Sequence, residues 1–411
     1  MKQHNSFFAA IAILTLFHIA TARDLRTVTE PKTPETCTSL IATGGDDTKL
    51  IQNALDSCVE GKAVALASGT FNSGPLTIPS GVNLLVEEGV ILESIPDPKL
   101  YDKGSNICGT IDDLGVGCKA FITISGAKGS GIYGKGMIQG QGYAVINTKK
   151  VTWFKLNKVA IERGRRPNSP SLVEITDSVD ITVYQVTLTN SALYHITSNR
   201  TVGLTVWGIA INSPMATVMS YGVVIDGSRN VTIAYSRITT VDDDVHIVGK
   251  TAPTQYVSVY ENHVGSGNGL AIGSHVDYGV SHVTFSNMTL NALSNGLRIK
   301  TNTLDGGPVS DIRYENICMY RVRFPINIDT SYGGLTGGRL FMLRNIDFNN
   351  IHVGSSGSFI FQGLSEHNPI TISINGLHFT VNSTWSIANT HISGSLAADH
   401  VRPSSCTNFK Y

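Results

Sequence analysis

Residues 230–259 read NVTIAYSRITTVDDDVHIVGKTAPTQYVSV, and this stretch contains the pattern that decides the fold. It begins with Asn230-Val-Thr-Ile and ends near Tyr256-Val-Ser-Val, two short segments in which polar and apolar residues alternate. Such alternation indicates β-strands, because successive side chains of a strand point to opposite faces. A second strand-like segment, Val245-His-Ile-Val, lies between them. The stretch therefore predicts a repeating unit of short strands without a helix inside it.

The same unit recurs along the second half of the chain, at intervals of roughly 23 to 34 residues. Further copies of the first segment begin at Asp180, Gly203, His282, Asp311 and Asn345. Further copies of the second segment begin at Gly222, Leu270, Gly296 and Ile326. A unit this small cannot bury its own apolar face, so it must stack on its neighbours. A β-propeller needs four strands per repeat, and a β-sandwich needs consistent hairpin turns that this sequence does not show. We therefore predict an all-β fold, a right-handed single-stranded parallel β-helix whose outward residues form a long groove.

The amino-terminal residues predict export. Residues 1–22 combine an apolar run from Phe7 to Ile19 with the small-residue cleavage motif Ala20-Thr-Ala, which is typical of a secretory signal peptide. We therefore assign residues 23–411 to one secreted, extracellular β-helix domain. Residues 46–58 have apolar side chains at helical spacing and predict a helix that caps the amino-terminal end. Four Asn-X-Thr sequons fit export, and the candidate glycosylation sites are Asn199, Asn230, Asn287 and Asn382.

Export also makes the six cysteines candidates for disulfide bonds. Six cysteines allow fifteen connectivities, and we favour the two local pairings plus the pair that remains. The predicted pairs are Cys37 with Cys58, Cys108 with Cys118, and Cys318 with Cys406. The third pair would attach the carboxyl-terminal tail to the body of the fold.

The overall composition limits the classes of partner. The 411 residues are 41% hydrophobic and 15% charged with a formal net charge of zero, which suits one large core and gives no general argument for nucleic acid. We predict a monomer without a nucleic-acid or membrane partner. Residues 149–166 are the one dense basic run, interpreted as a solvated loop that could guide a polyanion. Trp153 and Phe154 within it favour a contact with sugar.

Three adjacent carboxylates, Asp242-Asp243-Asp244, interrupt the strand pattern. An unpaired carboxylate is costly to bury, and like charges this close cannot all ionise freely. In a regular strand Asp242 and Asp243 would point apart, so they can serve one cleft only at a strand end or turn. Asp244 could share the face of Asp242. A solvated surface turn and a calcium site are the simpler alternatives.

Other polar residues fall at equivalent places in the following repeats. Stacked coils would bring Asn268, Arg298 and Tyr332 within a few strand spacings of ~4.8 Å from the aspartates. Arg298 and Lys300 alternate with an isoleucine, so both point outward, where they could bind a carboxylate or neutralise the aspartates. Paired acids beside such cations suggest hydrolysis of an acidic polysaccharide, in which one acid protonates the glycosidic oxygen and the other activates water.

With these motifs in place, the chain resembles the polygalacturonases of glycoside hydrolase family 28. The similarity extends over nearly the whole mature chain. The motifs that carry it are Gly45-Asp-Asp-Thr, Gly74-Pro-Leu-Thr, Gly131-Ile-Tyr-Gly, Asn190-Ser, Asp242-Asp243, Gly267 to Ser274 and Arg298-Ile-Lys300. The resemblance implies a pectin lyase-like solenoid, without cofactor or metal, that cuts the galacturonan backbone of pectin with inversion.

Carried over residue by residue, the resemblance assigns roles to five side chains. It implies that Asp242 is the general acid and that Asp243 is a base for the attacking water. Arg298 and Lys300 would bind the galacturonate carboxylate, and Tyr332 would assist near the cleavage subsite.

The sequence departs from the family pattern at two places. Tyr221 stands where the family has the aspartate of Asn-Thr-Asp-Gly, and Asn268 stands where it has the histidine of Gly-His-Gly. An amide can hydrogen-bond but cannot titrate, and the two losses are expected to slow galacturonan hydrolysis severely, since each acid–base group contributes ~10²–10⁴-fold. Tyr221 would be a sugar-stacking platform or would fill space.

Several functions stay open at this point. The enzyme could act weakly through Asp242 and Asp243, or could use Asp244 or His246 on another acidic or branched pectic polymer. It could also be an inactive protein that binds pectin or a pectinase-inhibitor protein. A calcium-dependent pectate lyase of similar architecture would suit the aspartate triplet, but Arg298 and Lys300 argue against it.

Overall fold

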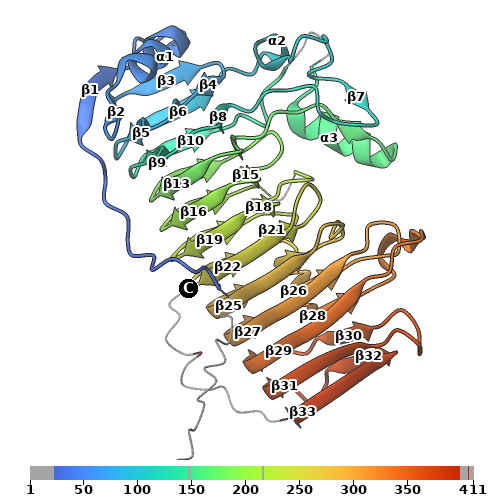
Figure 1. Cartoon of the computed structure of the whole chain (residues 1–411). Helices are drawn as coiled ribbons and strands as arrows, with labels where there is room; N and C mark the ends of the chain where they lie inside the picture. Colours follow the sequence, from blue (N-terminus) through green and yellow to red (C-terminus); the bar gives the residue numbers. More distant parts are fainter. Residues whose placement is uncertain (1–22, 147–149, 215–216, 399–405, 407–411) are drawn as a thin grey trace, which may run out of the picture.

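The computed structural model describes residues 23–146, 150–214, 217–398 and residue 406. The predicted signal peptide, residues 1–22, lies outside them. In the described part, short strands follow one another and stack along one axis from the amino-terminal to the carboxyl-terminal end (Figure 1). They form one 20-stranded sheet and one 11-stranded sheet, so each coil contributes strands to both.

The 20-stranded sheet contains the copies of the first repeated segment. Its strands are β1 (Thr36–Ile41), β2 (Ala63–Ser68), β3 (Thr70–Ser73), β5 (Asn83–Val86), β6 (Ile91–Ser94), β9 (Gly131–Tyr133), β10 (Met137–Gln139), β13 (Val179–Tyr184), β14 (Thr187–Thr189), β16 (Val202–Trp207), β17 (Ala210–Asn212), β19 (Arg229–Ala234), β20 (Arg237–Thr239), β22 (Thr254–Tyr260), β23 (His263–Gly265), β25 (Val280–Asn291), β27 (Pro308–Tyr320), β29 (Met342–Val353), β31 (Ile370–Phe379) and β33 (Thr390–Ala398).

The 11-stranded sheet contains the copies of the second segment. Its strands are β4 (Leu76–Thr77), β8 (Ile122–Ser125), β12 (Val173–Thr176), β15 (Ile196–Asn199), β18 (Val223–Asp226), β21 (Val245–Val248), β24 (Leu270–Ile272), β26 (Asn295–Lys300), β28 (Phe324–Asp329), β30 (Ser358–Gln362) and β32 (Thr384–Ala388). The remaining elements are β7 (Ile111–Asp112) with β11 (Arg166–Pro167), the helices α1 (Thr48–Ser57), α2 (Pro98–Tyr101) and α3 (Trp153–Glu162), and a 3₁₀ turn, η1 (Tyr332–Gly334).

The strands of the two large sheets pair in parallel, and their register explains the alternation in the sequence. Val245 of β21 lies opposite Leu270 of β24, which lies opposite Leu297 of β26, and all three are buried. The next position along β21, His246, belongs to a row on the other face of the strands that includes Ala271 and Arg298. His246 and Arg298 are partly exposed, whereas Ala271 is buried. Apolar rows therefore fill the core of the coil, and the polar members of the other rows lie toward its outer face. The predicted fold class, an all-β parallel β-helix, is confirmed.

The first residue of each repeated segment makes a bend. Asp180, Asn230, Asp311 and Asn345 have φ between 53° and 58°, and Gly203 has φ 83°. Asparagine, aspartate and glycine adopt such left-handed backbone more readily than other residues. Tyr256 and His282, which begin two further copies, have φ 59° and 58°, so the bend recurs in these copies although the residue type varies.

Aromatic side chains continue the stacking inside the carboxyl-terminal coils. The rings of Phe285 and Tyr314 are 5.0 Å apart and nearly parallel, and Tyr314 lies 4.9 Å from Phe348. All three are fully buried. Side chains in register across parallel strands thus form a continuous core ladder.

The predicted amino-terminal cap is confirmed. Helix α1 (Thr48–Ser57) falls inside the predicted residues 46–58 and packs against β2 and β4 through the buried side chains of Ile51 and Leu55. Its apolar face covers the first coil at the end of the solenoid (Figure 1).

All three predicted disulfides are present, and each ties a peripheral segment to a strand or loop. They join Cys37 to Cys58, Cys108 to Cys118, and Cys318 to Cys406. The third links a residue of the tail to β27, as expected.

The interpretation of residues 149–166 as a loop is wrong for the part that the structure describes. Residues 153–162 form α3, and the Thr152 hydroxyl caps it by accepting a hydrogen bond from the Lys155 amide at 3.1 Å. Trp153 and Phe154 are 1% and 9% exposed, so they pack inward and do not face sugar. Lys155 and Lys158 lie on the exposed side of this amphipathic helix.

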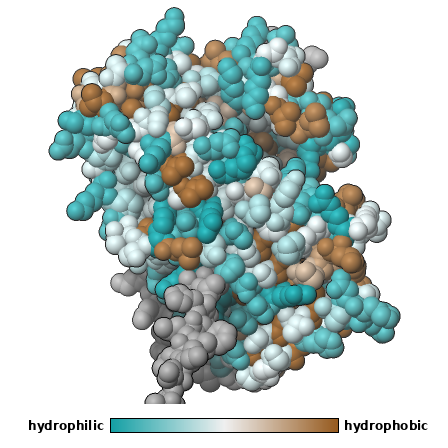
Figure 2. Space-filling view, in the orientation of Figure 1, coloured by the Kyte–Doolittle hydropathy of each residue, from teal (hydrophilic) through white to brown (hydrophobic). Residues whose placement is uncertain are grey.

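The four candidate glycosylation asparagines differ in exposure. Asn287 and Asn382 are exposed, whereas Asn199 and Asn230 are partly buried, and glycosylation of all four stays a prediction. The face drawn in Figure 2 carries small, interspersed hydrophilic and hydrophobic patches. No helix in the described residues is long and apolar enough to cross a membrane.

Candidate active site

The three aspartates lie in the turn that leads into β21, which breaks the alternation of a strand. Asp242 is partly exposed, whereas Asp243 and Asp244 are fully buried. The Asp242 Oδ1 atom accepts a hydrogen bond from the Asp243 amide at 3.0 Å. The turn thus separates the environments of three neighbouring carboxyl groups.

Asp244 closes the turn from the inside. Its Oδ1 accepts from the Thr240 amide at 3.1 Å and from the Thr240 hydroxyl at 2.9 Å, and its Oδ2 accepts from the Gly269 amide at 3.0 Å. Burial raises the pKa of this carboxyl well above its usual value. The expectation that Asp244 shares the face of Asp242 and contacts substrate does not fit this placement, because the residues form a turn and not a regular strand.

Asp243 is paired with the two cations of β26. The Lys300 Nζ atom donates to Asp243 Oδ2 at 2.7 Å, and the Arg298 Nη1 atom lies 3.8 Å from Asp243 Oδ1. Lys300 is itself only 5% exposed. One of the two expected cations therefore neutralises an aspartate, as the alternative interpretation of this pair proposed.

Asp242 is partly exposed beside the side-chain amide of Asn268. The Asn268 Nδ2 atom donates to Asp242 Oδ1 at 3.2 Å, and the Asn268 amide nitrogen donates to the Asp242 carbonyl at 2.8 Å. Burial, followed by the negative charge of Asp243, raises the pKa of the Asp242 carboxyl. Lys300 and the bond from Asn268 oppose this rise. The net effect favours a carboxyl that keeps its proton at higher pH than a solvated aspartate does.

Asn268 is oriented by a row of amides that the sequence analysis missed. The Asn295 Nδ2 atom donates to Asn268 Oδ1 at 3.3 Å, and the Asn327 Nδ2 atom donates to Asn295 Oδ1 at 2.8 Å. Because its oxygen is occupied, Asn268 presents its nitrogen to Asp242. Asn268 and Asn295 each precede by two residues the paired leucines Leu270 and Leu297, and this equivalence was the signal available in the sequence.

Tyr221 occupies the floor of the same region. Its ring meets Tyr194 edge-on at 4.9 Å and stacks on His246 at 5.1 Å. Burial, followed by the charges of Asp242 and Asp243, raises the pKa of the phenol well above its usual value, so it stays neutral. Neighbouring rings cover Tyr221, which agrees with the space-filling prediction better than with a free stacking platform.

His246 borders Asp243 without forming an ion pair. Its Nε2 atom donates to the Gly273 carbonyl at 2.6 Å and lies 3.8 Å from Asp243 Oδ2. Burial, followed by the charge of Lys300, lowers the pKa of this imidazole to about 3. The ring is therefore neutral in any solution near neutral pH and contributes no charge to the site.

Tyr332 lies against Arg298 and Lys300, as expected from the predicted stacking of the coils. Its ring centre is 5.1 Å from the Arg298 guanidinium carbon and 5.4 Å from Lys300 Nζ, within the range of cation–π contacts. Asn268, Asp242, Arg298 and Tyr332 are thus joined through direct contacts with one another or with Asp243 and Lys300. The stacking brings together the side chains that the sequence analysis expected to meet.

Comparison with known proteins agrees with this geometry. The sequence pattern of glycosyl hydrolases family 28 matches residues 75–404. The chain is 38% identical over 389 residues to an endo-polygalacturonase of Pectobacterium parmentieri, covering 93% of this chain and 96% of that protein. It is also 38% identical over 386 residues to an endo-polygalacturonase of Pectobacterium carotovorum subsp. carotovorum, covering 92% and 96%.

Solved structures show the same relationship. The polygalacturonase from Erwinia carotovora ssp. carotovora superposes with a TM-score of 0.86 at 38% identity, over 90% of this chain and all (100%) of that one. An exopolygalacturonase from Thermotoga maritima, at 20% identity and a TM-score of 0.74 over 90% and 92% of the two chains, shares the fold. The chain therefore belongs to glycosyl hydrolases family 28 and is a polygalacturonase-like glycosidase.

Proposed function

We propose that this glycosidase is secreted as a monomer and hydrolyses the α-1,4-galacturonan backbone of pectin with Asp242 as the general acid. The observation that carries the proposal is the raised pKa of Asp242, which is partly exposed and held by Asn268. A carboxyl that retains its proton can donate it to the glycosidic oxygen as the bond breaks. The endo-polygalacturonase relatives support galacturonan as the polymer.

Asp243 is the proposed base for the attacking water. Its Oδ1 atom has no hydrogen-bond donor among the residues that the structure describes, so one acceptor site stays unused. The Lys300 ammonium at 2.7 Å offsets the negative charge of the Asp243 carboxylate. A proton donor at Asp242 and a base at Asp243 are the two roles that an inverting glycosidase requires.

Arg298 is the cation best placed to bind the uronate carboxylate of the polymer. Its Nε atom is buried and lacks a hydrogen-bond partner in the described part of the chain, and its contact with Asp243 is long at 3.8 Å. A guanidinium with unused donors can take a carboxylate through two parallel hydrogen bonds. Lys300, by contrast, already donates to Asp243, so we propose that its main effect is on the base.

A second candidate is an inactive protein that binds pectin, or a decoy that binds a pectinase-inhibitor protein. The complete burial of Asp243 favours it, since water must reach this carboxylate for hydrolysis. Tyr221 is neutral and supplies no third carboxylate beside Asp242 and Asp243, which would leave the reaction slow.

A product assay on polygalacturonate, with and without a chelator, separates these functions. New reducing ends without unsaturated products, made by the unmutated protein and lost in Asp242→Asn, support the proposed hydrolase. Binding of polygalacturonate without any product supports the inactive protein. Unsaturated products that disappear with the chelator would show the lyase reaction instead. Equal rates for Asp242→Asn and the unmutated protein would refute the acid assignment.

A further inference from the structure

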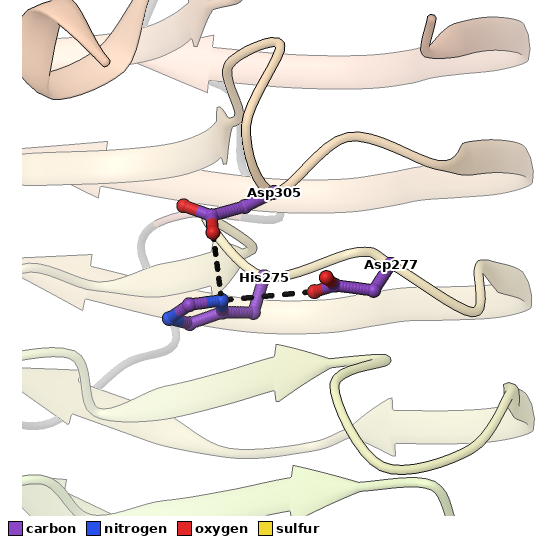
Figure 3. A group of neighbouring side chains, drawn as sticks. All are labelled: His275, Asp277 and Asp305. Carbon is purple, nitrogen blue, oxygen red and sulfur yellow. Dashed lines mark ion pairs between the residues drawn. The ribbon is translucent and has the colours of Figure 1, made fainter. Parts of the chain in front are cut away.

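A second group of chemically active side chains lies in the turns beside the aspartates. His275 and Asp277 belong to the turn between β24 and β25, and Asp305 belongs to the turn between β26 and β27. Figure 3 shows the His275 imidazole facing both carboxylates. The proposed galacturonan site uses none of the three. We infer that these residues form a binding site for one divalent transition-metal ion, with Zn²⁺ as its representative.

The spacing of the ligand atoms fits such an ion. His275 Nδ1 lies 3.2 Å from Asp305 Oδ1 and 3.6 Å from Asp277 Oδ2. Metal–ligand bonds of about 2.0–2.2 Å place two ligands of a tetrahedral ion roughly 3.3–3.6 Å apart. All three ligand atoms lie within 4.8 Å of one another. A small inward movement of the side chains would therefore complete the coordination.

One oxygen of the group lacks a hydrogen-bond donor, which points to a ligand independently of the spacing. Asp277 Oδ2 is buried and accepts no hydrogen bond from any residue that the structure describes. The His275 nitrogen at 3.6 Å is beyond hydrogen-bond distance. A buried carboxylate oxygen without a donor is costly, and a cation between it and the imidazole removes that cost.

The other oxygens of both carboxylates are held by neighbouring side chains. Arg339 Nη1 donates to Asp277 Oδ1 at 2.7 Å, and Asn302 Nδ2 donates to Asp305 Oδ2 at 3.1 Å. Each aspartate therefore keeps one oxygen directed to the shared point. Metal ligands are commonly oriented by such outer hydrogen bonds, and preorganised carboxylates lose less freedom on binding.

The donor set selects the kind of ion. One imidazole nitrogen with two carboxylates suits Zn²⁺, Co²⁺ or Mn²⁺, whereas Ca²⁺ takes six to eight oxygens and is not served by a ligand set of this size. The His275 side chain is 34% exposed, so solvent can complete the coordination. The two carboxylates and the Arg339 guanidinium together carry a net charge of −1, which attracts a cation.

Metal binding would stabilise the segment that holds Tyr332 beside the proposed substrate site. Asn302 donates to Asp305 and, at 3.4 Å, to the backbone carbonyl of Tyr332, the residue whose ring contacts Arg298. An ion that joins the two turns therefore stabilises the segment that supports Tyr332. This site is separate from the aspartates of the proposed mechanism, for which no metal is expected.

The test is Zn²⁺ binding to the untagged full chain after treatment with EDTA and dialysis, by isothermal titration calorimetry at about pH 7.5. We expect one Zn²⁺ per chain, a higher melting temperature by about 2 °C or more with excess Zn²⁺, and visible ligand-field bands when Co²⁺ replaces Zn²⁺. His275→Gln and Asp305→Asn should each weaken binding at least tenfold. His282→Gln, which removes a histidine 3.9 Å from the single carboxylate of Asp311, is the matched control and should bind Zn²⁺ normally.

Three results would overturn the inference. They are the absence of saturable binding to the unmutated chain, equal affinity in the His275→Gln and Asp305→Asn variants, and Ca²⁺ binding tighter than Zn²⁺ binding. Circular dichroism checks that the variants are folded. If a variant does not fold, the Co²⁺ spectrum of the unmutated chain decides, because a spectrum like that of free Co²⁺ contradicts the site. None of these readouts depends on activity toward polygalacturonate.

Discussion

Replacing Lys300 with methionine removes the cation that neutralises the buried carboxylate of Asp243. Asp243 is 0% exposed and Lys300 is 5% exposed, and their charged atoms are 2.7 Å apart. At an effective dielectric constant of about 20, two unit charges at this distance attract by roughly 6 kcal/mol. Part of that attraction offsets the cost of burying both ions, and removal of one partner from such a pair typically costs about 3–5 kcal/mol. We therefore expect Lys300→Met to lower the free energy of unfolding by about 3–5 kcal/mol near neutral pH.

The origin of this loss can be tested by restoring neutrality. The double variant Asp243→Asn/Lys300→Met should recover much of the stability, because neither charge of the pair stays buried. Urea unfolding followed by tryptophan fluorescence measures the unmutated protein and both variants near neutral pH. Lys250→Met, at an exposed lysine, is the control and should change stability by less than about 0.5 kcal/mol. A loss below about 1 kcal/mol in Lys300→Met, or no recovery in the double variant, would contradict this account.

Four further predictions follow from the site and the core. Asp242→Asn should slow release of reducing ends from polygalacturonate by roughly 10²–10⁴-fold. The same variant should be as stable as the unmutated protein or more stable in urea unfolding near neutral pH. The reason is that the pKa of Asp242 is raised in the folded protein, so ionisation of this carboxyl opposes folding. A decrease in stability near neutral pH would contradict the second part. The rate should fall as pH rises through the raised pKa of Asp242. In the pH profile of kcat/KM, the alkaline decrease should therefore lie above the pKa of a solvated aspartate, about 3.9. A decrease at or below that pH would be inconsistent with Asp242 as the acid. Asp244→Asn should lower the free energy of unfolding by about 1–3 kcal/mol, since the new amide cannot accept all the bonds now donated by Thr240 and Gly269, and an unchanged urea midpoint would argue against this role. Tyr314→Ala should cost about 3–5 kcal/mol by opening a cavity between two stacked rings, and a loss under about 1 kcal/mol in the same assay would mean that the ladder repacks.

Much of the scaffold could be predicted from the sequence because every repeat shows the same alternation of polar and apolar residues. Alternation of polar and apolar residues assigned strands to the two sheets, and the spacing of the copies required them to stack. Helix α1 and the three disulfide pairs also agree with the structure. By contrast, α3 was not predicted. The lysines of this stretch suggested a solvated loop, although Trp153, Leu156 and Ala160 form an apolar helix face.

The contacts of the candidate site could be predicted only in part from the local sequence pattern. The meeting of Asp242 with Asn268 and of Lys300 with Asp243 follows from stacking and could be expected from repeat spacing. Their roles in catalysis stay predictions until the variants are measured. The directions of the three aspartates could not be read, because alternation holds along a strand but fails in a turn.

The coil follows from local sequence, since repeated bends and apolar rows are encoded within each segment. Three contacts could be seen only in the folded chain: Asp244 braces a turn, an amide row orients Asn268, and His275 lies next to Asp305. These contacts join side chains of different coils or side chains across an irregular turn. Their geometry depends on how the turns bend and pack, which no short-range periodicity specifies.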